Sequence, residues 1–367
     1  MEKDIIININ TSAVVASVVS YGKKNAKPKI EYTEVNYIDF KKDIDFDLLK
    51  QNTQKSLEFV LEKIYNFLHL TGNLNTVNRG YVFLSSPWIK KKFYQIKDEN
   101  LKPFLANSEY LEKFIGDNGT VSQDSEIVSA EILSVKANGY NLSLTDIVDK
   151  KINKIEASIL DTQIKTEDKN FIEEIILNKF NTLKITFSAF LPVFLNQIQN
   201  IVGDKKDFAF LDFTGEMMEY GIYKNHEIKD VVIVQEGRNE IIRSLVSEKI
   251  SENNIEAEKT FILFLKEQLK DEKKKQVQEV IDKHIERIKK EIQKQTEKYD
   301  FLELPQKTFV LSYGLMNLIL ENYTFLNQII FINKSYIKQF VNFENDNHYN
   351  IFTAVEADYI YQTQKTN

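Results

Sequence analysis

The chain has 367 residues, of which 43% are hydrophobic and 28% charged, so it can bury the core of two or three domains or of one large two-lobed body. The formal net charge of -6 excludes a basic nucleic-acid-binding surface, and the absence of Cys excludes disulfides, thiolate zinc sites and a cysteine nucleophile. There is no signal-peptide pattern and no run of about 18 apolar residues, so we expect a cytoplasmic protein without a membrane span.

The first part of the chain predicts a strand-turn-strand unit followed by alternating helices and strands. β-branched residues alternate over residues 4–19, on either side of a polar turn, and a further strand is predicted at 29–40. A long apolar stripe predicts a helix at 46–70, and Gly72 is a stop signal after it. A short buried strand is predicted at 81–84.

Residues 88–166 have a different texture and predict a small α+β insert. A short helix is expected near 110–115 and strands near 127–136 and 152–164, with Asn138-Gly139 as a turn signal. The three lysines at 90–92 are interpreted as a solvated charged rim.

The second part of the chain repeats the pattern of the first. Helices are predicted at 170–180 and 189–202, and a second strand-turn-strand unit begins near Phe208, which suggests two related halves. Helical stretches are predicted at 236–269, 271–298, 315–321 and 351–363, and a strand at 308–311.

Three loops carry a resemblance to one superfamily. The turn of the first hairpin reads Asn8-Ile9-Asn10-Thr11-Ser12, that of the second reads Asp212-Phe213-Thr214-Gly215-Glu216-Met217-Met218, and a later segment reads Val310-Leu311-Ser312-Tyr313-Gly314-Leu315. In the same order, these segments resemble the D-I-G-T-S, D-I-G-G-G-T-T and V-L-T-G-G-G loops of actin-like ATPases. Glu256-Ala257-Glu258-Lys259 is similar to the A-E-x-x-K helix of the FtsA/PilM branch of that superfamily, and the insert lies where that branch places its extra subdomain.

The resemblance implies an α/β, actin-like (ribonuclease H-like), two-lobed fold with an FtsA/PilM-type insert. It divides the chain into a lobe 1 core (1–87 and 167–206), the insert (88–166), a lobe 2 core (207–250 and 306–367) and a helical subdomain (251–305). It also implies an ATP/Mg²⁺ site between the lobes. The residues that it assigns to the nucleotide are Asn8, Asn10, Thr11, Ser12, Asp212, Thr214, Gly215, Glu258 and Gly314, with Asp212 as the metal ligand.

The loops depart from the superfamily pattern in ways that weaken a nucleotide site. Gly makes up 11 residues of the chain, although glycine lets a backbone approach phosphates closely. Asn8 replaces an acid, Asn10 replaces a glycine, and Glu216 would bring a carboxylate to the phosphates. We therefore expect weak nucleotide binding or none, little or no ATPase activity, and no other catalytic residue.

The resemblance implies a cytoplasmic scaffold that binds the tail of a membrane protein through residues 88–166, in cell division or in type IV pilus assembly. The C-terminal residues 359–367 show no basic amphipathic stripe, so we expect no direct membrane anchor, although recruitment to the inner face of the membrane and self-association stay open. The alternatives are an active, polymerising actin-like ATPase and a small-molecule kinase on the same fold.

Overall fold

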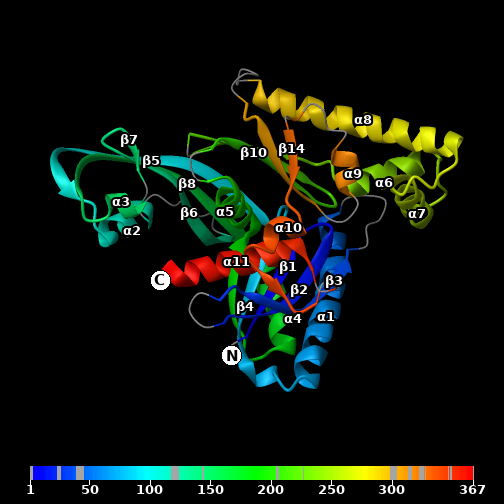
Figure 1. Cartoon of the computed structure of the whole chain (residues 1–367), viewed down its shortest axis with the longest axis horizontal. Helices are drawn as coiled ribbons and strands as arrows, with labels where there is room; N and C mark the ends of the chain where they lie inside the picture. The colour runs from blue at the N-terminus through cyan, green and yellow to red at the C-terminus, as the bar shows by residue number, and fades with distance from the viewer. Residues whose placement is uncertain are drawn as a thin grey trace.

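The computed structural model contains two similar α/β lobes and a smaller third sheet (Figure 1). It describes residues 3–22, 26–38, 45–116, 124–142, 144–203, 206–225, 227–297, 304–312, 316–321, 326, 328–345, 347 and 349–366.

The first lobe is built on a six-stranded sheet with the order β15-β3-β2-β1-β4-β9. The strands are β1 (Lys3–Ile9), β2 (Ala13–Ser20), β3 (Lys29–Tyr37), β4 (Val77–Leu84), β9 (Lys184–Ala189) and β15 (Asn342–Phe343). Alternate residues of β1 pack to opposite faces: Ile5 and Ile7 lie in one apolar cluster and Ile6 in another. Helices α1 (Phe46–Leu70) and α4 (Thr166–Lys179) cover the first of these faces, and a short 3-10 helix (Leu74–Thr76) joins α1 to β4.

The second lobe repeats this arrangement with the order β12-β11-β10-β13-β14. Its strands are β10 (Phe208–Phe213), β11 (Met218–Lys224), β12 (Glu227–Val234), β13 (Lys307–Ser312) and β14 (Gln328–Phe331). As in lobe 1, an antiparallel hairpin is followed by a parallel neighbour, because β10 pairs with β11 and β13 just as β1 pairs with β2 and β4. The two related halves predicted from the sequence are therefore present in the sheets.

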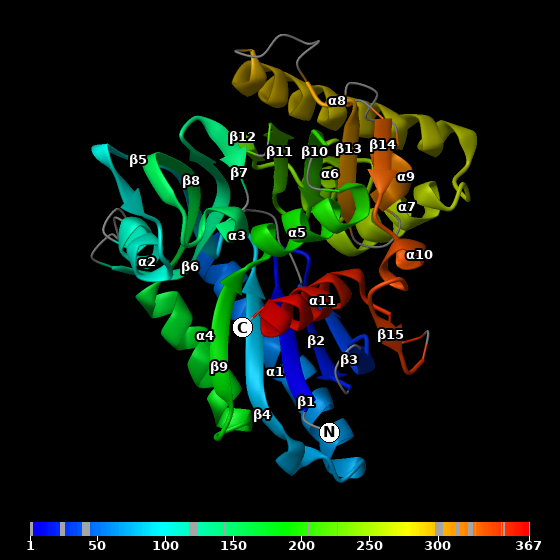
Figure 2. The ribbon, with the colours of Figure 1, turned by 60° about the vertical axis from the view of Figure 1, so that its left-hand side comes forward.

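Helices pack on both faces of the second sheet. On its outer face lie α6 (Arg238–Ser247), α7 (Asn254–Leu265), α8 (Asp271–Thr296) and α9 (Asn317–Leu320). Between the two sheets lie α5 (Phe190–Val202) and α11 (Ile351–Thr366), whose apolar side chains share one buried cluster with residues of both sheets (Figure 2). This shared cluster joins the two lobes.

The insert forms a four-stranded antiparallel sheet with the order β5-β8-β6-β7. It consists of β5 (Ile89–Leu105), α2 (Ser108–Gly116), β6 (Ser125–Ala137), β7 (Tyr140–Leu142), α3 (Leu144–Ile147) and β8 (Lys151–Lys165). The predicted Asn138-Gly139 turn is confirmed, since both residues have positive φ between β6 and β7. The sequence analysis did not predict the 17-residue strand β5, whose alternating charged residues hide its period.

Two expectations are corrected by the structure. The helix predicted at 236–269 is two helices, because Lys249 takes a positive φ after α6 and Asn253 caps the start of α7. The stretch 306–367, which the sequence analysis placed wholly in lobe 2, returns to lobe 1. After the short helix α10 (Lys334–Ile337), β15 pairs with β3, and α11 packs against β1 and β2.

Candidate functional site

The loop between β1 and β2 and the loop between β10 and β11 are joined by a chain of hydrogen bonds. The backbone N–H of Glu216 donates to Thr11 Oγ1 over 2.9 Å, and the hydroxyl groups of Thr11 and Thr214 lie 2.8 Å apart. Thr214 Oγ1 in turn lies 2.9 Å from the Met217 carbonyl oxygen, to which it donates. Because the Thr214 hydroxyl hydrogen is used in this bond, the Thr11 hydroxyl group must be the donor to Thr214 Oγ1. The first loop is thereby fastened to the second.

The backbone of the second loop contacts both its opposite loop and the start of α6. A Cβ atom on Gly215 would lie 2.4 Å from the Thr11 carbonyl oxygen, so the two loops touch at this glycine. The carbonyl groups of Thr214 and Gly215 accept from Arg238 N and Asn239 N, which are among the first donors of α6. Gly237 is required for the same approach, because its Cβ would lie 2.3 Å from the Gly215 carbonyl oxygen.

The first loop is held by its own asparagine side chains. Asn10 Oδ1 accepts from the backbone N–H groups of Ser12 and Ala13, and Asn10 Nδ2 donates to Asn8 Oδ1 over 2.8 Å. Asn8 Nδ2 donates to Glu356 Oε1 of α11 over 2.5 Å. Burial raises the pKa of the Glu356 carboxyl group well above its usual range, with the Asn8 hydrogen bond acting in the opposite direction. The Asn8 side chain therefore holds the first loop to α11.

Glu216 does not face the cleft, contrary to the sequence expectation. Its carboxylate accepts from Arg243 at 2.7 and 3.2 Å and from Asn239 Nδ2 at 2.7 Å, and both partners belong to α6. Because the pair is buried and bidentate, the negative charge of Glu216 is balanced inside lobe 2. The sequence missed this arrangement because nothing in the loop itself points to Arg243.

Asp212 lies in a separate buried group of charges. It stands opposite Glu219 in the β10–β11 pair, and Glu219 forms an ion pair with Lys91 of β5. Burial, and then the nearby Glu219 carboxylate, raise the pKa of Asp212 to about 8, while Lys91 opposes the shift. The Lys91 side chain is only 3% exposed, so the predicted solvated rim is wrong at this residue.

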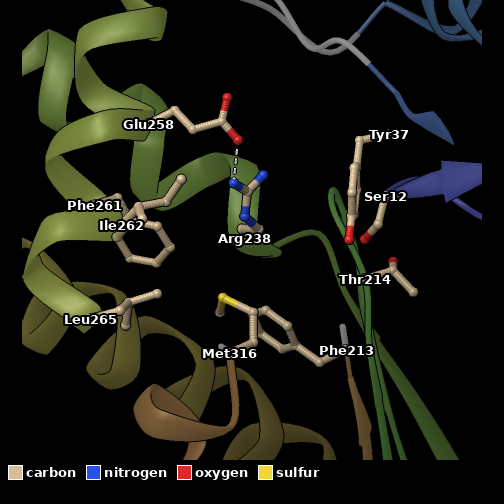
Figure 3. A pocket seen from close by; sticks show the side chains of 10 residues that line it. All are labelled: Ser12, Tyr37, Phe213, Thr214, Arg238, Glu258, Phe261, Ile262, Leu265 and Met316. Atoms are coloured by element: carbon tan, nitrogen blue, oxygen red, sulfur yellow. Dashed lines mark hydrogen bonds and ion pairs between the residues drawn. The ribbon is translucent and has the colours of Figure 1, made fainter. Parts of the chain in front are cut away.

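A pocket of about 370 Å³ lies next to the two hydrogen-bonded hairpin loops, which we call the closed loops (Figure 3). Its apolar wall is formed by Phe213, Phe261, Ile262, Leu265 and Met316. Its polar lining is formed by Ser12, Tyr37, Thr214, Arg238 and Glu258. Arg238 and Glu258 are ion-paired with each other. Ser12 and Tyr37 belong to lobe 1 and the other residues to lobe 2, so the pocket bridges the lobes.

The structure separates the residues that the sequence grouped into one site. Asn8, Asn10, Thr11, Thr214 and Gly215 meet at the closed loops, whereas Ser12, Thr214 and Glu258 line the pocket. Asp212 lies with Glu219 and Lys91 and does not line the pocket. Gly314 lies outside the described residues. Sequence reasoning missed the roles of Lys91, Arg238 and Glu356, whose partners lie 128, 20 and 348 positions away in the chain.

Comparison with known proteins gives a relationship at the level of fold. No family model and no curated protein matches the chain. A solved PilM-PilN type IV pilus biogenesis complex matches 96% of this chain over 94% of its own, with a TM-score of 0.62 and 11% sequence identity.

The chain therefore has an actin-like fold. A Bacteroides thetaiotaomicron protein with an actin-like ATPase fold and unknown function also matches, with a TM-score of 0.40, 11% identity and coverage of 97% of this chain and 95% of that one. The ethanolamine utilization protein EutJ from Carboxydothermus hydrogenoformans matches at a TM-score of 0.44 and 10% identity, over 90% of this chain and 85% of that one.

The residues present do not fit the magnesium triphosphate that an actin-like ATPase implies. The Glu216 N–H group, which a phosphate would need, donates to Thr11, and the Thr214 N–H group donates to the Met217 carbonyl oxygen. Asp212, the predicted metal ligand, lies buried opposite Glu219, which is ion-paired with Lys91, and it does not line the pocket. None of the described helices has the length and apolarity of a transmembrane span.

Proposed function

We propose that this protein is an actin-like scaffold of the FtsA/PilM type that hydrolyses ATP weakly or not at all. The observation that supports this proposal most strongly is the Thr11–Thr214 hydrogen bond, which joins the two loops where the fold would hold phosphates. An actin-like fold that cannot hold a triphosphate retains its rigid lobes and its surface, and these suit it to binding other proteins. The same hydrogen bond between the two loops argues against the two alternatives, the polymerising ATPase and the small-molecule kinase.

The partner in this proposal is the cytoplasmic tail of a membrane protein, in pilus assembly or cell division, bound through residues 88–166. One solved neighbour of the same fold is a PilM-PilN complex, which supports the expectation of a protein partner. The insert is also firmly fixed to both lobes. Lys91 pairs with Glu219 of lobe 2, and Tyr359 of α11 donates to Glu131 of β6 over 3.1 Å. Binding at the insert would therefore recruit the whole body to the membrane surface.

Site-specific photo-crosslinking tests where the partner binds. A photoreactive amino acid would replace Tyr140 of the insert, which is 74% exposed, and in a control variant Ile255 of α7, which is 70% exposed. The proposal expects a crosslinked single-pass membrane protein from the Tyr140 position and none from the Ile255 position. Equal crosslinking from both positions, or from Ile255 alone, would overturn the assignment to the insert.

Phosphate release tests the loss of hydrolysis. The purified chain with Mg²⁺ and ATP should release phosphate no faster than a chain carrying Asp212→Asn, since Asp212 has no catalytic role in the proposal. Steady turnover that Asp212→Asn abolishes would show a working ATPase and would contradict the proposal.

A further inference from the structure

The strand β5 forms one edge of the insert's sheet. It ends the order β5-β8-β6-β7, so within the described part of the chain its neighbour in the sheet is β8. An edge strand presents backbone N–H and C=O groups to which another extended chain can add. We propose that β5 binds an extended acidic segment of another protein, which joins the sheet as a further strand. The inference goes beyond the proposed tail-binding role, because it concerns a second surface and a second partner.

The outer edge of β5 points away from the sheets of the two lobes. β6, which is two strands away from β5, contacts β9 of lobe 1 and β12 of lobe 2. In Figure 2, β5 accordingly lies on the side of the insert away from lobe 2. Tyr140 belongs to β7, at the opposite edge of the sheet. The β5 edge is therefore a separate surface from the one that the Tyr140 crosslink probes.

The stretch of β5 that suits strand addition runs from Ile89 to Glu99. Over this stretch each residue pairs one-to-one with β8, from Ile89 opposite Ile164 to Glu99 opposite Lys154, and the register shifts only after Glu99. The stretch contains neither Pro nor Gly, whereas Pro103 lies in the irregular part beyond it. It is longer than a typical strand of about five or six residues, so a partner segment of ordinary length would meet a regular edge.

The side chains along this stretch favour an acidic partner. Lys90 and Lys92 are exposed on one face of β5, and Phe93, which is 37% exposed, lies on the other face. Residues 89–97 include four lysines, two of which form ion pairs within the protein, and no acid, although the whole chain has a net charge of -6. Cross-strand neighbours share a face, so an added strand would place acids opposite Lys90 and Lys92 and an apolar residue opposite Phe93. The expected segment therefore alternates acids with apolar residues.

The same lysines argue against a second copy of this chain as the occupant. Two β5 strands that paired antiparallel about Lys91 would place Lys90 of each opposite Lys92 of the other. Like charges directly opposite each other on one face are destabilising. Lysines on an edge strand therefore discourage pairing between identical chains, whereas they attract an acidic one.

Fluorescence anisotropy of the full-length chain with labelled peptides tests the proposal. The probe is a peptide of about nine residues, somewhat longer than a typical strand, in which Glu alternates with Val. One control peptide has Lys in place of Glu, and the other has the same composition with all its Glu residues at one end. The alternating acidic peptide should bind at least about tenfold more tightly than either control. Equal binding by the second control, or no binding by the alternating peptide at millimolar concentration, overturns the proposal.

Matched charge reversals locate the site. Lys90→Glu combined with Lys92→Glu acts on the β5 edge, whereas Lys150→Glu combined with Lys151→Glu makes the same charge change at exposed residues at the start of β8. The first double variant should weaken binding of the alternating acidic peptide at least about tenfold, and the second should leave it unchanged. All four lysines are exposed, so the core stays intact, and circular dichroism checks the folding of both variants. Equal peptide affinity in the two double variants contradicts the proposal.

Hydrogen–deuterium exchange shows how the peptide binds. The proposal expects slower exchange of backbone amides within residues 89–99 and unchanged exchange at 140–142 of β7, because the added strand bonds to the β5 backbone. Peptide binding without this protection overturns the proposal. Two other results assign the edge to a different occupant and overturn it as well. One is a dimer of the chain alone that protects the β5 amides. The other is binding to vesicles of phosphatidylserine and phosphatidylcholine that depends on Lys90 and Lys92, in the absence of peptide binding.

Discussion

Asp212 and Glu219 stand directly opposite each other on β10 and β11, and Lys91 of the insert forms its ion pair with Glu219. Two adjacent carboxylates repel each other in a buried site, and the charge of Lys91 opposes the resulting rise in the pKa of Asp212 without cancelling it. The arrangement is consistent with a proton on Asp212, whose pKa is raised to about 8 by burial and by Glu219. Charge balance at the contact between insert and lobe 2 therefore depends on pH.

Asp212→Asn should change how stability depends on pH. The folded-state pKa of Asp212 lies above its ordinary value of 3.8, so its favourable contribution is complete below about pH 4 and is lost as pH rises towards 8. The Asp212→Asn variant does not lose stability in this way, because its amide does not ionise. Its stability relative to the natural protein should therefore increase as the pH rises between these limits and then level off. Urea unfolding at a series of pH values measures the difference, and a difference that is constant with pH contradicts the expectation.

Lys91→Met should destabilise the protein because it leaves the Glu219 carboxylate buried without a cation. The side chains of the pair are 3% and 5% exposed, and removing one partner of a buried pair costs about 3–5 kcal/mol. Adding Glu219→Gln to Lys91→Met removes the unpaired charge, so the double variant should regain most of the loss. Urea unfolding provides the free energies. A double variant no more stable than Lys91→Met would show that the cost comes from lost packing of the lysine.

Thr11→Val should weaken the contact between the two loops. It removes the acceptor of the Glu216 N–H group and the donor to Thr214, and an unsatisfied buried N–H group costs about 1–3 kcal/mol. Thr11→Ser keeps the hydroxyl group and should cost much less. The same unfolding measurement compares the two variants. If valine and serine are equally tolerated, the hydrogen-bond chain does not hold the loops together.

Asn8→Asp restores the acid of the actin-like pattern, yet it should destabilise this chain. The new carboxylate would face Glu356 Oε1, which now accepts from Asn8 Nδ2. Because both groups are fully buried, we expect a loss of about 3–5 kcal/mol, the range for a buried charge without a partner. Glu356→Gln in the same chain supplies an amide donor and should recover most of it. A gain of Mg²⁺-dependent ATP binding in Asn8→Asp would instead show that the missing acid alone had disabled the site.

The sequence by itself determined the strands and helices with a clear period. The alternation of β-branched residues in β1 and β2, the apolar stripe of α1, and the recurrence of a strand-turn-strand unit at Phe208 all follow from local chemistry. The order of three weak loop patterns was sufficient to predict the two-lobed fold. The sequence analysis did not predict β5, where charged residues obscure the period, and it predicted one helix where the structure has α6 and α7.

Only the tertiary structure decided which side chains meet. Asn8 and Glu356 are 348 positions apart, and Thr11 and Thr214 are 203 apart, so neither contact has a local signal. From its position in the motif, the Glu216 carboxylate was expected to face the phosphates. In the folded chain it instead accepts a hydrogen bond from Arg243 over 2.7 Å. The physical reason is that a buried polar group must find a partner among whatever the fold places around it, and that choice is made by packing and not by sequence order.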